Sequence, residues 1–170
     1  MNSPEQILLA SLTHLMARWS SAGTQAAVAA DAGVQIDPVD LPPLYMLGLE
    51  GPSRASALAA SLRISRPTTT KQLNRLAAAG YIERVPDPAD RRASIVQLSR
   101  RGVEVHARLV EQGIVMVSDA LTGWSSAESA AFASQLARFV GALGVDPDSG
   151  REPAPGPARS ASGSQNGERT

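Results

Sequence analysis

SRPTTTKQLNRLAAAGYIERVPDPADRRASIVQLSRRG, residues 65–102, decides the fold of this chain. Ser65 is suited to cap a helix, and the helix that follows has no acidic residue before Gly80 ends it. Two short runs, 81–85 and 95–98, have the composition of β-strands, and the polar loop between them holds two prolines. The stretch therefore predicts a helix followed by a β-ribbon with a projecting loop.

Two shorter helical segments come before this stretch. Residues 42–50 are apolar and end at a Gly-Pro pair, and residues 53–62 have Ser53 as a cap. A tight turn at 63–64 joins the second segment to the helix that begins after Ser65. Three helices followed by a β-ribbon are typical of a winged helix-turn-helix, in which the second helix of the pair enters the major groove of DNA.

Longer amphipathic helices flank this part. One is expected from Ser3, with Gln6 completing a capping box, through a weak point at Gly23 to about residue 32, and 33–43 is expected to be a turn region. Two more are expected within 99–144. Their apolar residues recur at spacings of four and three, as in a seam between helices. These residues are Leu8, Leu12, Leu15, Trp19, Val110, Ile114, Val117, Leu136, Phe139 and Leu143.

The predicted fold class is mainly α with a small β-ribbon (α+β): a winged helix-turn-helix between N- and C-terminal helices. One domain is expected over 1–145, with the winged helix at about 41–98 and the flanking helices at about 3–32 and 99–144. Residues 146–170 contain no large apolar side chain, so they are expected to be a disordered tail.

The charge of the chain is unevenly distributed. The 170 residues have a formal net charge of zero, but 51–112 holds eleven basic and five acidic residues, a local net charge of +6. Such a region indicates an anionic partner, or alternatively a charged face that only meets solvent.

Several classes of function are excluded. The chain has no cysteine, so it has no disulfide, thiolate nucleophile or cysteine redox switch. Its two histidines lack partners at metal-ligand spacing, and no phosphate loop or nucleophile signature is present. We therefore expect no enzymatic activity, no metal and no cofactor. No signal peptide and no apolar run of about 18 residues is found, so a cytoplasmic protein without a membrane segment is expected.

The helix after Ser65 has a polar face suited to DNA. A helical wheel places Thr69, Leu73, Leu76 and Ala77 on the inner side, with Thr68, Lys71, Gln72 and Arg75 outside. Hydroxyl, amine, amide and guanidinium groups match the edges of bases and the phosphates. Arg66 lies near the helix N-terminus, where free N–H groups favour a phosphate. The alternative is an ordinary amphipathic surface helix, but such a face usually mixes acids with bases.

The loop of the ribbon carries Asp90, Arg91 and Arg92. Arginines at such a tip are expected to reach the adjacent minor groove, and Asp90 is expected to hold the tip by pairing with an arginine. Arg54 and Arg84 are further candidates for phosphate contacts. A second pair, Arg100 and Arg101, lies at the base of the ribbon and is expected to meet either phosphate or acids of the same fold.

At these residues the chain resembles the MarR family of bacterial transcription regulators. The resemblance rests on the capped helix, on Gly80-Tyr81-Ile82, on the D-x-R of Asp90-Arg91-Arg92, and on the closing Leu98-Ser99-Arg100-Arg101-Gly102. It implies that Arg92 enters the minor groove, that Asp90 braces it, and that Ser65, Thr68, Lys71 and Gln72 face the major groove of double-stranded DNA.

The resemblance also implies a homodimer built from the first and the last two helices, and a two-fold dimer predicts a pseudo-palindromic operator. A repressor relieved by a small-molecule effector is expected from the family, with activation left open. Trp19, His14, Tyr45 and Met46 are either effector-lining residues or plain core, and no effector site is assigned. The alternative function is a winged-helix module for protein interaction without specific DNA binding.

Overall fold

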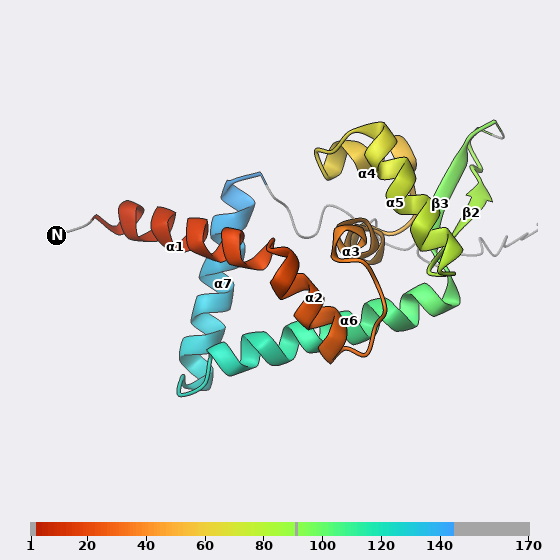
Figure 1. Cartoon of the computed structure of the whole chain (residues 1–170). Helices are drawn as coiled ribbons and strands as arrows, with labels where there is room; N and C mark the ends of the chain where they lie inside the picture. The colour runs from red at the N-terminus through yellow and green to blue at the C-terminus, as the bar shows by residue number, and fades with distance from the viewer. Residues whose placement is uncertain (1–2, 91, 145–170) are drawn as a thin grey trace, which may run out of the picture.

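The computed structural model describes residues 3–90 and 92–144, and Figure 1 shows the arrangement of its elements. The predicted tail at 146–170 lies outside the described residues. Helices make up most of this part, with one small sheet. The helices are α1 (Pro4–Trp19), α2 (Ala22–Asp31), the 3-10 turn η1 (Pro38–Asp40), α3 (Leu41–Glu50), α4 (Ala55–Ser61), α5 (Arg66–Ala78), α6 (Arg100–Ala120) and α7 (Ser126–Ala142).

The sheet is antiparallel and has the order β1 (Ser53–Arg54), β3 (Ser94–Leu98), β2 (Ile82–Pro86). The predicted ribbon is confirmed, with Ile82 opposite Leu98 at its base. The prediction that Ser53 caps the next helix is wrong, because 53–54 pairs with β3 and α4 begins only at Ala55. A strand of two residues has no periodicity, so only its pairing with a distant partner defines it.

The N-terminal helix is divided, contrary to the prediction of one helix that continues to about residue 32. α1 begins with the expected capping box of Ser3 and Gln6, but it ends at Trp19. The Ser20 hydroxyl donates to the Met16 carbonyl at 2.6 Å, and Ser21 caps α2 by accepting from the Thr24 N–H at 3.2 Å. Serine side chains compete in this way with the helical hydrogen bonds of the backbone, and Gly23 lies within α2.

The hydrophobic core belongs to the winged helix and to the parts of α2 and α6 that pack on it. It contains Val28, Leu41, Leu44, Leu47, Leu58, Leu73, Leu76, Tyr81, Ile82, Val96, Val105 and Leu109. Among the residues that the structure describes, α1 and α7 contribute no buried side chain. Figure 1 shows α6 running from the sheet to the turn before α7, with α4, α5 and the ribbon together on one side of α6.

Gly102 allows α6 to begin directly against the ribbon. A Cβ at this position would lie 1.8 Å from the Tyr81 carbonyl oxygen. That carbonyl accepts from the Ser99 N–H at 3.0 Å, and the Ser99 hydroxyl donates to the Gly80 carbonyl at 2.6 Å. Ser99 also caps α6 by accepting from the Gly102 N–H at 3.0 Å. A side chain at position 102 would therefore push the long helix away from the ribbon.

We predict that Gly102→Ala lowers the free energy of unfolding by about 2 kcal/mol, because the added methyl group collides with backbone. Urea unfolding followed by circular dichroism, at fixed protein concentration, measures this. Gly23→Ala is the matched control, since nothing lies within 4 Å of the added Cβ and alanine favours the helix. Equal stability of Gly102→Ala and the wild type would contradict the close approach.

Candidate nucleic-acid interface

Helix α5 presents an exposed polar surface that begins at its N-terminus. Ser65 caps the helix as predicted, since its Oγ accepts from the Thr68 N–H at 3.3 Å. Pro67 occupies the first turn, where it has no hydrogen bond to lose. Thr68 and Lys71 are exposed and Thr69 is buried, as the helical wheel predicts, and Arg66 near the helix N-terminus is exposed as well. The N-terminal half of α5 therefore offers a guanidinium, a hydroxyl and an amine to an external partner.

The expectation that Gln72 lies on the exposed face is wrong. Gln72 is only 7% exposed, and its Nε2 donates to the Val39 carbonyl of η1. Ala77, which was expected inside, is exposed. The buried side of α5 is thus shifted toward Gln72, because η1 packs on that flank. The helical wheel of α5 alone contains no information about this neighbour.

Arg75 is exposed in part, but its guanidinium is already bound within the fold. Nε donates to Asp40 Oδ2 at 2.7 Å and Nη2 donates to Asp40 Oδ1 at 2.5 Å. The Asp40 side chain is only 4% exposed. The hydrogen bonds that Arg75 donates to the Asp40 carboxylate raise the pKa of Arg75, so the guanidinium stays charged. Arg75 and Gln72 therefore fasten α5 to η1 instead of pointing away from the protein.

In the tip of the ribbon, which we call the wing (residues 86–94), Asp90 forms hydrogen bonds with the backbone of the residues that follow it. Asp90 Oδ1 accepts from the backbone N–H of Arg92 at 3.0 Å, and the Ala93 N–H donates to the Asp90 carbonyl at 2.8 Å. Asp90 was expected to pair with an arginine side chain, and its hydrogen bond to Arg92 goes to the backbone. Arg92 is exposed, and Arg91 lies outside the described residues.

The two arginines proposed for phosphates also have partners within the protein. Arg54 pairs with Asp87 at 2.5 Å between Nη2 and Oδ2. Arg84 Nη2 donates to Asn74 Oδ1 at 3.2 Å, which joins β2 to α5. Arg84 remains exposed, so this single bond leaves it available to solvent.

The arginine pair at the base of the ribbon meets groups of the same fold. Arg100 Nε lies 3.5 Å from Glu104 Oε1 on the exposed side of α6. Arg101 Nη1 donates to the Ala79 carbonyl at 3.0 Å, and its guanidinium carbon lies 5.0 Å from the centre of the Tyr81 ring. Arg101 thus satisfies a carbonyl at the C-terminal end of α5.

The flanking helices leave apolar side chains on the surface. The residues predicted to form seams are exposed or partly exposed in this single chain, with Ile114 and Leu143 each 63% exposed. Other exposed apolar residues lie on the same helices, namely Ile7, Leu9, Met16, Val115 and Phe132, and Trp124 is exposed in the turn between α6 and α7.

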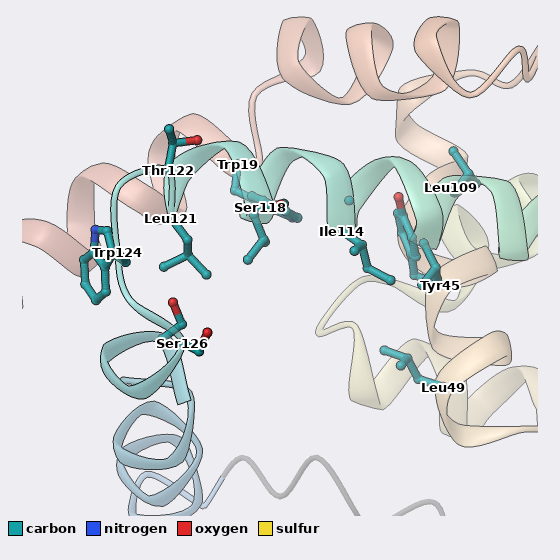
Figure 2. A pocket seen from close by; sticks show the side chains of 14 residues that line it. Trp19, Tyr45, Leu49, Leu109, Ile114, Ser118, Leu121, Thr122, Trp124 and Ser126 are labelled. Carbon is teal, nitrogen blue, oxygen red and sulfur yellow. The ribbon is translucent and has the colours of Figure 1, made fainter. Parts of the chain in front are cut away.

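Two clefts lie where these helices meet the winged helix. The larger, of about 1110 Å³, extends from Tyr45 and Leu49 of α3 along α6 to Trp124 beyond the α6 end (Figure 2). The smaller, of about 350 Å³, lies between the α1–α2 junction and η1, and Val39 and Gln25 line it. Trp19 and Tyr45 line both clefts.

The two histidines lie on different helices. His106 of α6 packs on α3, where a Cβ on Gly48 would lie 2.2 Å from its Nε2, and burial lowers the pKa of His106. His14 is exposed on α1.

Within 3–90 and 92–144, no three His, Cys, Asp or Glu side chains are placed to hold a metal ion. No helix in the same ranges is long and apolar enough to cross a membrane.

Comparisons with known proteins agree with this geometry. A model of the MarR family matches residues 35–93, from the segment before η1 into the wing. The HTH-type transcriptional regulator PecS of Dickeya dadantii (strain 3937) is 32% identical over 83 residues, which are 49% of this chain and 50% of PecS. The match therefore spans about half the length of that protein.

Two solved structures share the fold. A MarR family protein from Bacillus stearothermophilus matches with a TM-score of 0.70 and 19% identity, over 85% of this chain and 99% of the other. Streptococcus pneumoniae FabT in complex with DNA matches with a TM-score of 0.63 and 23% identity, over 82% of this chain and 97% of the other.

The fold is that of a winged helix-turn-helix protein with helical arms on both sides of the winged helix. Over residues 35–93 the chain is similar to the MarR family. The predicted fold class is therefore confirmed, and the comparisons support the predicted resemblance to the MarR family. PecS is named a transcriptional regulator, in agreement with the prediction that this chain is not an enzyme.

We predict that Arg75→Ala lowers the thermal unfolding midpoint by several degrees, because the buried Asp40 carboxylate loses its charged partner. Circular dichroism at fixed protein concentration measures the midpoint. The double variant Asp40→Ala/Arg75→Ala removes both charges and is expected to recover part of the loss. Lys71→Ala, on the exposed side of the same helix, is expected to leave the midpoint unchanged. Equal midpoints for Arg75→Ala and Lys71→Ala would show that the ion pair does not hold α5.

Proposed function

We propose that the chain is a sequence-specific transcription regulator that binds double-stranded DNA through α5 and the wing. The observation that carries this proposal is the acid-free exposed face of α5, which lies on the same side of α6 as the wing with its exposed Arg92. The relative PecS is named a transcriptional regulator, and FabT, which shares the fold, is seen in complex with DNA.

Different residues of this surface have different tasks in the proposal. Ser65, Thr68 and Lys71 face the major groove, and Arg66 meets a phosphate near the α5 N-terminus, where free N–H groups add to its charge. Arg92 enters the adjacent minor groove, whose negative potential favours a guanidinium. Gln72 and Arg75 do not contact DNA in this proposal, and they act by holding α5 against η1.

We predict that Arg92→Ala weakens binding to a specific operator by about tenfold or more, because it removes a minor-groove contact. Lys71→Ala is expected to lower affinity and, if the amine meets phosphate, to reduce the salt slope by about one. Fluorescence anisotropy with DNA from the protein's own promoter region and with scrambled DNA, at several salt concentrations, measures both effects.

Arg108→Ala is the matched control, because Arg108 is exposed on the first half of α6, outside α5 and the wing. The proposal requires a preference of about a thousandfold for specific DNA. Weak binding that is equal on both DNAs would refute sequence-specific binding and show that the surface is only a basic patch. An Arg92→Ala affinity within about twofold of the wild type would remove the wing from the interface.

The functional unit in this proposal is a homodimer. Neither α1 nor α7 buries a side chain within one chain, and large apolar patches on a surface indicate an interface. A second copy that covers α1, the end of α6 and α7 would bury the seam residues. A two-fold axis between the copies would present two α5 helices to a pseudo-palindromic operator.

We predict that Ile114→Glu raises the dimer dissociation constant by about a hundredfold or more, because it places a charge in an apolar interface. Sedimentation equilibrium over a range of concentrations measures this constant. Val103→Glu is the control, since Val103 is similarly exposed on α6 but lies at the end next to the ribbon. A wild-type chain that stays monomeric at about 100 μM would refute the dimer.

Repression relieved by a small ligand completes the proposal. A dimer on a promoter would block polymerase, and the two clefts supply apolar walls for a ligand. The smaller cleft includes Val39, whose carbonyl accepts the hydrogen bond from Gln72 of α5. A ligand that moves η1 would therefore also move α5 relative to its partner helix across the operator.

A further inference from the structure

Asp87 is a buried carboxylate with exposed residues on both sides of it in the wing. Its side chain is 5% exposed, whereas Pro86, Pro88, Ala89, Asp90 and Arg92 are all exposed. Both carboxylate oxygens are in use. Oδ1 accepts from the Ala89 N–H at 2.8 Å, and Oδ2 accepts from Arg54 Nε at 2.6 Å. The Asp87 N–H also donates to the Ala93 carbonyl at 3.1 Å, so one residue holds both sides of the wing.

Arg54 connects this carboxylate to the helix-turn-helix. It is the last residue of β1, where it pairs with Ile95 of β3, and it also occupies the N-cap position of α4. Its Nε and Nη2 both reach Asp87. The ion pair therefore joins the wing to the start of the helix that precedes α5, across 33 residues of sequence.

The ion pair persists at neutral pH. The Ala89 N–H and the Arg54 guanidinium hold the pKa of Asp87 below its ordinary value, so the carboxylate is charged. An arginine that turned away to meet a DNA phosphate would leave this charge buried without its partner, which is unfavourable. The geometry thus opposes the expectation that Arg54 is itself a phosphate contact.

We propose that Arg54 is a positioning residue, which acts on DNA through Asp87 by setting the angle of the wing relative to α4 and α5. The proposal rests on the proposed function, because the wing matters only if Arg92 reaches DNA. In this arrangement the Arg54–Asp87 ion pair orients the wing so that Arg92 reaches the minor groove, and Arg54 itself does not contact DNA.

A double-mutant cycle separates positioning from direct contact. Arg54→Gln is expected to weaken operator binding by about tenfold in the wild type, but by less than about twofold in an Arg92→Ala background. The salt slope is expected to stay unchanged with Arg54→Gln. Effects that multiply in the double variant, together with a salt slope lower by about one, would overturn the proposal and make Arg54 a phosphate contact.

Asp87→Asn provides a second test with opposite expectations. Removing a negative charge near DNA strengthens binding if only electrostatics acts. Positioning predicts weaker binding, and again only when Arg92 is present. Tighter binding by Asp87→Asn would overturn the proposal.

Hydrogen exchange gives a readout that needs no DNA. The Ala89 and Arg92 N–H groups, which bind Asp87 and Asp90, are expected to exchange at least about fivefold faster in Arg54→Gln and Asp87→Asn, while core amides of α5 keep their rates. Unchanged exchange in the wing would overturn the proposal. If the variants exchange faster but the wild-type protein does not select specific DNA, the Arg54–Asp87 ion pair positions the wing and the proposed function is refuted.

Discussion

Arg75 and Asp40 form a two-bond ion pair beneath helix α5, and the orientation of this helix depends on it. A helix of 13 residues is marginal by itself in water, so α5 needs tertiary contacts. Leu73 and Leu76 supply the apolar part, and Gln72 adds a hydrogen bond to the Val39 carbonyl. Because η1 lies between α2 and α3 in the chain, the same contacts connect α2 to the helix that carries the exposed polar face, α5.

Polar residues near the proposed DNA surface divide into those that hold the fold and those that remain free. Arg54, Gln72, Arg75 and Arg101 are engaged with aspartates, carbonyls or an aromatic ring of the same chain. Lys71 on α5 and Arg92 in the wing are exposed, on the parts of the fold that these residues position. A count of basic residues therefore overstates the positive charge available to a partner, since two of the arginines neutralise buried aspartates.

The molecule has one core and two arms without cores. Fourteen buried residues connect the winged helix, α2 and the first half of α6. The arms, α1 and α7 with the end of α6, expose the apolar side chains that a helix normally buries. This contrast is the physical basis of the proposed dimer, and it also produces the open cleft that Figure 2 shows between α3 and the α6 end.

Local patterns in the sequence determined the order of the main helices, the caps at Ser3 and Ser65, the ribbon, and the resemblance to the MarR family, because these depend on residues close together in the chain. Only the tertiary structure decided which side of α5 is buried, where β1 pairs, and that Arg54 and Arg75 bind Asp87 and Asp40, 33 and 35 residues away. Helical periodicity describes one helix at a time. The partner of a charged side chain is set by the packing of several elements, which no local pattern contains.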